Sequence, residues 1–194
     1  MIKHSIHDKI ESALINATLS CVDTNKILPE MVFVGNWHKF LFCESDHVFS
    51  ADFSDTLSKL LDADKSDAVG MVNIGMLYDE KLKNKSSAYI ARNTINHDYS
   101  KTLNNKNDND EWIYRMDRYI LSPSSGNWCI YCERINEICI ISVKEGYDFI
   151  FEKIQDGGIW LGDIKDLIAG GGTYLFPFNK LIPEWRSSLI KNYS

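Results

Sequence analysis

Apolar and turn-forming positions follow a regular pattern between Trp112 and Val143. Aromatic and β-branched residues fill three stretches, whereas Pro, Gly, Ser and Asn fall between the stretches. This pattern predicts three antiparallel strands in a meander, at 112–121, 128–133 and 138–143. Because both faces of the second and third strands are largely apolar, other elements must cover the sheet on both sides. We therefore expect an α+β fold with a central antiparallel sheet covered by helices.

Helical spacing predicts the elements that cover this sheet. Near the N-terminus, apolar residues recur every three or four positions from Ile6 to Ala17, as one face of a helix requires. A second amphipathic stretch begins near Asp52 and Ser54, either of which is a candidate N-cap. Shorter helices are expected at three further places, which begin after Gly146, at Asp163 and at Pro183.

Three shorter apolar runs predict strands ahead of the meander. Met31–Val34 is followed by a Gly35-Asn36 turn, and Lys39–Cys43 is its expected hairpin partner. A buried strand is expected at Val69–Ile74, where the run is apolar and too short for a helix.

A polar stretch at 81–111 separates this strand from the meander. Lysine, asparagine and serine dominate its two ends, and a brief apolar run at 88–91 lies between them. We expect long, mobile loops here, with room for one short element. Residues 1–194 are interpreted as one domain, since a chain of this length with 44% hydrophobic residues can bury a core of its own.

The negative charge of the chain is concentrated in one segment. The formal net charge is −6, and residues 42–80 hold nine acids against two lysines, so this segment alone carries −7. Such a segment is either a solvated helix-and-loop surface or a docking face for a basic partner, whose association its field would steer. The acidic balance argues against a nucleic-acid partner, because phosphate neutralisation needs clustered Lys and Arg.

Composition predicts a cytoplasmic protein. No apolar run approaches the roughly 20 residues of a membrane span, and the first residues lack the apolar stretch of a signal peptide. The five cysteines are odd in number and irregularly spaced among apolar neighbours, as buried free thiols are in a reducing compartment. We expect no disulfide and no membrane partner.

Familiar catalytic and metal-binding motifs are missing from the sequence, so we expect neither enzyme activity nor a cofactor. Cys129 and Cys132 have the spacing of a metal pair, but on a strand their sulfurs point to opposite faces. Glu133 and Glu137 bracket a tight turn. They either take part in a cross-strand ion pair that fixes the register or do acid–base work in a pocket formed by the fold.

The meander contains Tyr119–Trp128 and Tyr131–Arg134, followed by Glu137-Ile138. With these stretches the chain resembles small bacterial immunity proteins, which are encoded beside contact-dependent or other polymorphic toxins and neutralise their active domains. The resemblance implies a cytosolic binding protein whose partner is a cognate toxin domain, such as a basic nuclease. Because these families differ in fold, the resemblance transfers no binding residue to this chain.

Charge and position select the candidate contacts to such a partner. They are Asp62, Asp64 and Asp67 in the acidic segment and Glu133 and Glu137 at the turn. Two other classes of function remain open. A small enzyme would bring Glu133, Glu137 or His97 into one pocket, and a subunit of a larger assembly would expose an apolar patch.

Overall fold

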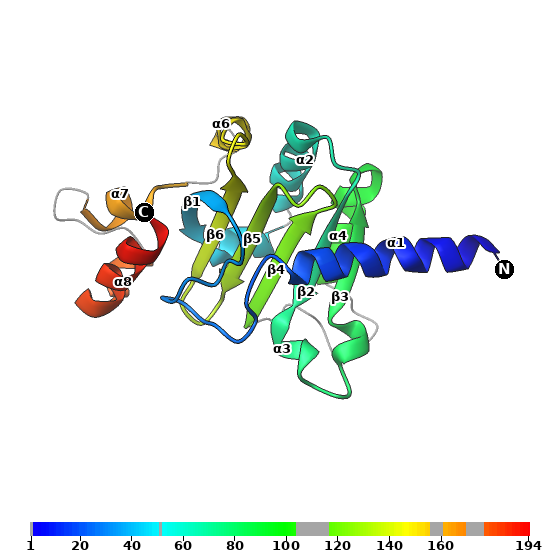
Figure 1. The fold of residues 1–194 in the computed structure, drawn as a ribbon, viewed down its shortest axis with the longest axis horizontal. Helices are drawn as coiled ribbons and strands as arrows, with labels where there is room; N and C mark the ends of the chain where they lie inside the picture. The colour runs from blue at the N-terminus through cyan, green and yellow to red at the C-terminus, as the bar shows by residue number, and fades with distance from the viewer. Residues whose placement is uncertain (1, 51, 104–116, 156–160, 170–176) are drawn as a thin grey trace.

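The computed structural model describes residues 2–50, 52–103, 117–155, 161–169 and 177–194 (Figure 1). Its centre is a six-stranded antiparallel sheet in the order β1-β6-β5-β4-β2-β3. The expected α+β fold with a central antiparallel sheet is thereby confirmed. The strands are β1 (Trp37–Glu44), β2 (Ala68–Asn73), β3 (Ser87–Ala91), β4 (Arg118–Pro123), β5 (Trp128–Glu133) and β6 (Ile138–Lys144).

The predicted meander forms the middle of the sheet as β4, β5 and β6. Every residue of β5 is buried, because its alternate side chains enter the cores on the two faces of the sheet. The turn between β4 and β5 passes through Gly126, whose φ of 68° suits a residue without a side chain. The first described strand of the meander begins at Arg118, and the predicted strand residues 112–116 lie outside the described residues.

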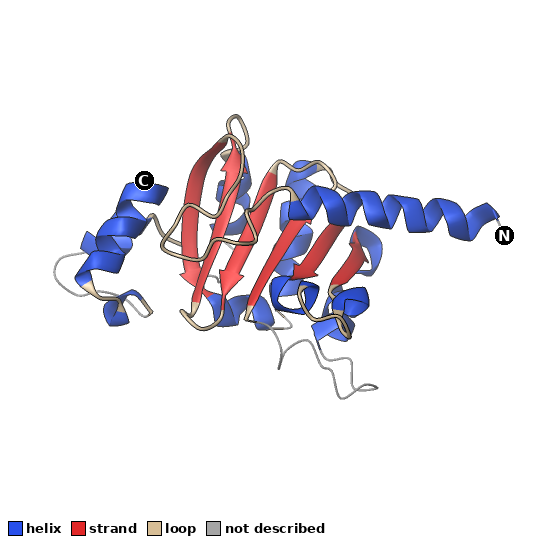
Figure 2. Cartoon of the chain, turned by 60° about the horizontal axis from the view of Figure 1, so that its bottom comes forward, coloured by secondary structure: helices blue, strands red, loops and turns tan. Residues whose placement is uncertain are grey.

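Helices cover both faces of the sheet, as its two-sided apolar strands predict (Figure 1, Figure 2). One face packs against α2 (Phe53–Asp64), α4 (Ile95–Leu103) and α6 (Phe149–Gln155). The other face packs against α1 (Ile2–Leu19), α7 (Ile164–Ala169), α8 (Pro183–Tyr193) and the connection at 20–36. The short helical elements are α3 (Ile74–Leu77), η1 (Ser45–Phe49), η2 (Lys83–Lys85), η3 (Arg92–Thr94) and η4 (Phe178–Lys180).

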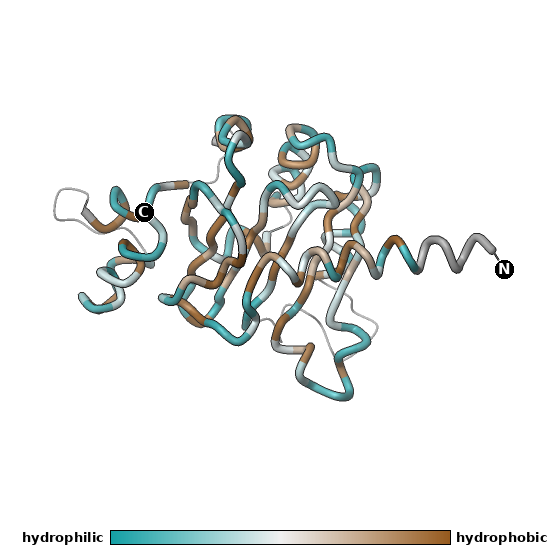
Figure 3. The backbone as a smooth tube through the Cα atoms, in the orientation of Figure 1, coloured by the Kyte–Doolittle hydropathy of each residue, from teal (hydrophilic) through white to brown (hydrophobic). Residues whose placement is uncertain are grey.

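Helix α1 crosses the strands and extends past β3, so that its N-terminal part lies beyond the edge of the sheet (Figure 1, Figure 2). The helix lies against β2 at Gly70. A Cβ atom at Gly70 would lie 2.4 Å from Thr18 Oγ1 and 3.1 Å from Leu14 Cγ. The missing side chain at this position is therefore what lets α1 rest on the sheet. The strands of the sheet are predominantly apolar, as expected for strands that are covered on both faces (Figure 3).

The predicted hairpin between Met31–Val34 and Lys39–Cys43 is wrong. Lys39–Cys43 belong to β1, which pairs with β6, whereas Phe33 forms an isolated bridge with Val22. Six of the seven residues of β6 are buried. Pairing β1 with this strand at the side of the meander removes more apolar surface from water than a local hairpin would.

The polar stretch is not the run of loops that its composition predicts, at least as far as Leu103. It contains β3 and α4 as well as two short 3-10 turns. Ile95, Tyr99 and Leu103 recur every four positions and are buried, so α4 has an apolar stripe that its polar neighbours conceal. The rest of the predicted loop, residues 104–111, lies outside the described residues.

Candidate functional site

The fold separates the five candidate residues into two groups at opposite ends of the sheet. Asp62, Asp64 and Asp67 lie where α2 ends and β2 begins. The first residues of β2 pair with the end of β4 at Pro123, whereas Glu133 pairs with Arg118 at the start of β4. The three aspartates, called the acidic corner below, are therefore distant from the β5–β6 turn.

Asp64 in the acidic corner is occupied by contacts within the protein. Its Oδ2 accepts hydrogen bonds from Ser66 Oγ at 2.5 Å and from Ser125 Oγ, and its Oδ1 accepts one from Asn127 Nδ2 at 2.8 Å. These bonds tie the end of α2 to the turn between β4 and β5. Asp64 thus shapes the corner instead of offering a free charge.

The other two aspartates of the corner face the solvent. The side chain of Asp62 is 66% exposed and forms an ion pair with Arg92 Nη1 at 3.3 Å. Asp67 is exposed, and its backbone carbonyl accepts a hydrogen bond from the backbone N–H of Arg92 at 2.8 Å. An exposed pair of this kind contributes about 0–1 kcal/mol, so a basic group of another protein can replace Arg92 at little cost.

An apolar groove of about 450 Å³ opens beside Asp67, between α1 and the edge of the sheet. It is called the α1 groove below. The walls are predominantly hydrophobic, and one of the lining residues, Ile10, is 56% exposed. The lining residues are Ile10, Ala13, Leu14 and Ala17 of α1 together with Asp67, Ala68, Tyr89 and Ser124. The α1 groove and the acidic corner therefore meet at Asp67, which belongs to both.

Glu133 is buried and does not lie on the surface. The residue is 1% exposed, and its Oε1 accepts hydrogen bonds from the backbone N–H of Leu28 at 2.7 Å and from Tyr131 Oη at 2.6 Å. Asn136 Nδ2 donates to Oε2 at 2.5 Å. Burial, and then the neighbouring Glu133 charge, raises the pKa of Tyr131 well above its ordinary value. Glu133 is a predicted partner contact, but its carboxylate is enclosed by groups of the protein itself, so the interface proposed below does not include it.

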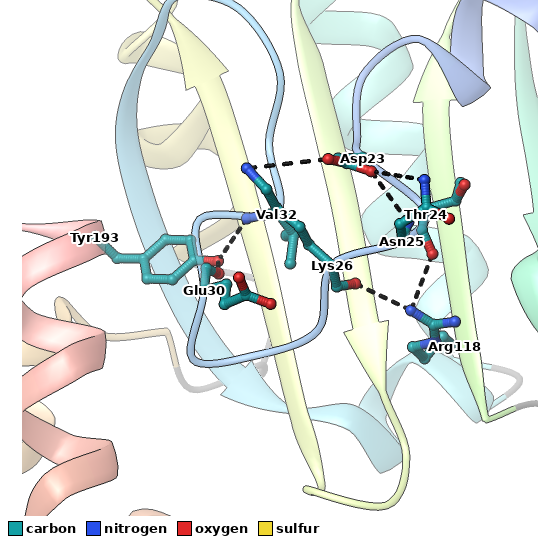
Figure 4. Close-up of polar contacts among 8 residues, drawn as sticks. All are labelled: Asp23, Thr24, Asn25, Lys26, Glu30, Val32, Arg118 and Tyr193. Atoms are coloured by element: carbon teal, nitrogen blue, oxygen red, sulfur yellow. Dashed lines mark hydrogen bonds and ion pairs between the residues drawn. The ribbon is translucent and has the colours of Figure 1, made fainter.

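Together with the hydrogen bond from Leu28 to Glu133, the polar contacts drawn in Figure 4 form a network that holds the 20–36 connection on the sheet. Arg118 Nη1 donates to the carbonyls of Thr24 at 3.2 Å and Lys26 at 3.0 Å. Tyr193 Oη accepts from the backbone N–H of Val32 at 3.1 Å and donates to the carbonyl of Glu30. The network explains why the sequence places a carboxylate and an arginine opposite each other on adjacent strands.

Glu137 lies beside the turn with an accessible but paired carboxylate. Its side chain is 37% exposed and accepts from Lys180 Nζ at 2.7 Å, and its backbone φ is 58°. The ion pair thus connects the turn to η4 and does not run between β5 and β6. For Glu137, the observed ion pair is therefore a contact to the C-terminal region.

The fold does not bring His97 to the two glutamates. His97 lies on α4, where its exposed ring contacts Asp98 at 2.9 Å and borders a shallow hollow with Arg92. Hydrogen bonds, first from Thr94 and then from His97, hold the pKa of Asp98 below its ordinary value. Within the described part of the chain, no group of three or more His, Cys, Asp or Glu side chains is arranged to hold a metal ion.

These observations define an α+β protein with a six-stranded antiparallel sheet and an apolar groove beside an acidic corner. Comparison of the chain with protein-family models, curated proteins and solved structures finds no match. Among the described residues, no helix has the length and apolar character needed to cross a membrane. A proposal about function must therefore rest on the surface residues described above.

Sequence reasoning found the acidic corner and missed the α1 groove. The sequence could predict the acidic corner because its three aspartates fall within six residues of one another along the chain. The apolar stripe from Ile6 to Ala17 predicts a helix packed on a core, but it does not show how far that helix extends past the sheet. The sequence feature that could have indicated the groove is the pair Ala13 and Ala17, whose small side chains leave room beside the helix.

Proposed function

We propose that this chain is an immunity protein, which binds a cognate bacterial toxin domain and occludes its active site. The observation that carries the proposal is the α1 groove, whose lining includes the exposed Asp67 of the acidic corner. Specific interfaces combine an apolar centre with a polar, charged periphery, and the groove and the acidic corner have that composition. The resemblance of the meander to immunity proteins supports the same class.

The charge of the surface favours a basic partner, such as a nuclease domain. Asp62 and Asp67 are exposed, and they belong to a segment with a formal charge of −7. A field of one sign accelerates the encounter with a partner of the opposite sign, and this effect weakens as salt is added. An inhibitor of a toxin that acts inside the cell gains from fast association, since the toxin must be captured before it reaches its substrate. The proposed site of action is the cytoplasm.

The proposal requires no catalysis by this chain. Binding would be enough, since a protein seated over the active site of a toxin excludes its substrate. Asp62 would exchange its ion pair with the Arg92 side chain for contacts with basic side chains of the toxin, and the exposed side chain of Asp67 would gain such contacts. The apolar walls of the α1 groove would receive an apolar side chain. Asp64 would keep the corner in shape through Ser125 and Asn127.

The test uses the toxin domain encoded next to the gene of this chain. Co-expression of the full chain is expected to restore growth of bacteria that produce this domain, and the purified proteins are expected to form a complex in calorimetry. The double variant Asp62→Asn/Asp67→Asn should weaken binding by roughly tenfold or more at low salt and reduce its salt dependence. The reason is that two exposed charges of the interface are lost.

A matched control separates this effect from the loss of charge as such. Asp166 and Glu184 are exposed acids on α7 and α8, which pack on each other near β1 at the opposite edge of the sheet from β3, and Asp166→Asn/Glu184→Gln removes the same charge. This control should bind like the original chain. Absence of any complex or growth rescue with the original chain would overturn the proposed function. Equal binding by both double variants would overturn the acidic corner as its site.

A further inference from the structure

Two cysteines from distant parts of the chain touch each other where the chain leaves α1. Cys21 follows the last residue of α1 by two positions, and Cys129 lies on β5. The two thiols are in side-chain hydrogen-bond contact. Cys21 is 7% exposed and Cys129 is fully buried, so the pair lies just beneath the surface, with Cys21 on the outer side.

Small polar groups surround the outer thiol. Cys21 Sγ lies 3.5 Å from Ser122 Oγ on β4 and 3.4 Å from the carbonyl of Ala17 on α1. Ser122 Oγ in turn donates to the carbonyl of Trp128 at 3.2 Å. On the strand next to β5, Ser142 is paired with Cys129. Cys21 and Cys129 therefore lie in a small cluster of polar groups within an otherwise apolar core.

The contacts with Cys129 and Ser122, rather than the one with the Ala17 carbonyl, favour the thiolate form of Cys21. The contact with Cys129 lowers the pKa of Cys21 to about 7 against the opposing effect of burial, and the contact with Ser122 and the charge of Lys144 add to the lowering. The pKa of Cys129 is raised well above its ordinary value by burial and by its contact with Cys21. The two thiols thus have different characters, since a thiolate attacks an oxidant and a neutral thiol does not.

We propose that Cys21 and Cys129 form a peroxide-sensitive dithiol, in which Cys21 is the attacking thiol and Cys129 the resolving thiol. The product is a disulfide that joins the end of α1 to β5. This modification site is independent of the proposed toxin-binding function, although it lies at the base of the helix that forms one wall of the α1 groove.

The chemistry requires hydrogen peroxide or another hydroperoxide as the oxidant. The Cys21 thiolate attacks one peroxide oxygen, the O–O bond breaks, and the departing oxygen takes a proton to leave as water, so that Cys21 becomes a sulfenic acid. The Cys129 sulfur then attacks the Cys21 sulfur. The S–O bond breaks as the S–S bond forms, and the hydroxide leaves as water with the Cys129 proton. Two thiols lose two electrons, and the peroxide is reduced to two waters.

The other cysteines provide an internal comparison. Cys43, Cys139 and Cys132 lie side by side on β1, β6 and β5 and are fully buried on the opposite face of the sheet. Burial is the largest cause that raises the pKa of Cys132 and Cys139 above the ordinary value. Proximity alone therefore predicts crosslinks in this row, whereas access and thiolate character predict the Cys21–Cys129 link.

The test is peptide mapping of the folded full chain after treatment with hydrogen peroxide, followed by alkylation under denaturing, non-reducing conditions. The expected product lacks two hydrogen atoms, contains the peptides of Cys21 and Cys129 linked to each other, and reverts with dithiothreitol. The midpoint of thermal unfolding should rise by several degrees on oxidation, because the new link constrains the unfolded chain.

Variants assign the roles of the two sulfurs. Cys129→Ser should stop the reaction at a sulfenic acid on Cys21, which dimedone labels, and Cys21→Ser should abolish both products. Cys43→Ser should form the same linked peptide as the original chain. Because the mapping of the original chain needs no variant, misfolding of a variant leaves the test intact. A linked peptide only among Cys43, Cys132 and Cys139, irreversible oxidation of Cys21 without a link, or no reaction would each overturn the proposal.

Discussion

At the scale of single residues, two carboxylates that are four positions apart have opposite environments. Glu133 is enclosed and accepts three hydrogen bonds, while Glu137 is partly exposed and contacts Lys180. A buried acceptor whose donors have no other partner is costly to remove, whereas an exposed ion pair contributes little. The two residues should therefore differ in their effect on stability, although both stand beside the same turn.

The variant Glu133→Gln is expected to lower the free energy of unfolding by about 1–3 kcal/mol. The substitution removes the charge from three hydrogen bonds and sets an amide N–H₂ against a donor of Leu28, Tyr131 or Asn136. The matched variant Glu137→Gln should cost less than about 1 kcal/mol, because only an exposed pair is lost. Urea unfolding of both variants measures the difference. Equal losses would show that the buried network does not support the 20–36 connection.

The sequence could predict the turn beside Glu133 but not its burial. The residues around the turn are neighbours in the chain, and the pattern of Asn and charged residues identifies them. The group that covers Glu133 is the backbone of Leu28, which lies 105 positions earlier. A connection with no regular secondary structure carries no periodic signal, so nothing in its sequence indicates which carboxylate it encloses.

At the scale of elements, the fold depends on which apolar faces find each other. The strands of the meander were predictable because both of their faces are apolar and their turns are short. The pairing of β1 with β6 was not, because it joins Lys39–Cys43 to residues about 100 positions away in the chain. The sequence did not predict α4, because polar residues in this helix outnumber its three buried residues Ile95, Tyr99 and Leu103.

The contact between α1 and β2 gives a prediction at this scale. Gly70→Ala places a methyl group where Thr18 Oγ1 would be 2.4 Å away. Thr18 is β-branched and fixed by a hydrogen bond to the carbonyl of Leu14 at 2.9 Å. The helix must therefore shift, and the expected loss in the free energy of unfolding is about 1–3 kcal/mol.

A double-mutant cycle isolates the contact that causes this loss. On a Thr18→Ala background, Gly70→Ala should be less destabilising, because the nearest obstructing atom is gone. The four free energies of unfolding, measured in urea, give the coupling directly. Purely additive effects would mean that Gly70 is required for a reason other than the close approach of α1.

At the scale of the whole molecule, the candidate surface is assembled from elements that the sequence keeps apart. The acidic corner was predictable because one short connection supplies all three aspartates. The α1 groove was not, because its walls come from α1, the start of β2, β3 and the β4–β5 turn. Its existence depends on α1 crossing the strands and continuing past the sheet, and helical periodicity does not encode that crossing direction.

Filling the α1 groove tests whether its apolar part contributes to the proposed toxin binding. Ala13 is exposed and lines the groove, so Ala13→Trp should occupy the space without disturbing the core. Binding of the toxin domain, measured by calorimetry, is expected to weaken by roughly tenfold or more, as blocked interface centres generally do. The midpoint of thermal unfolding should stay within a few degrees of the original value.

A tryptophan elsewhere on the same helix controls for bulk. Asn16 is exposed on α1 and borders a separate hollow with Glu11 and Ile15, and Asn16→Trp should leave binding unchanged. If both tryptophan variants lost binding equally, the partner would contact α1 broadly and not through the groove. If neither lost binding while Asp62→Asn/Asp67→Asn did, the acidic corner alone would form the interface. Loss with Ala13→Trp and with Asp62→Asn/Asp67→Asn, but not with Asn16→Trp, would show that the apolar groove and the acidic corner, which share Asp67, bind one partner together.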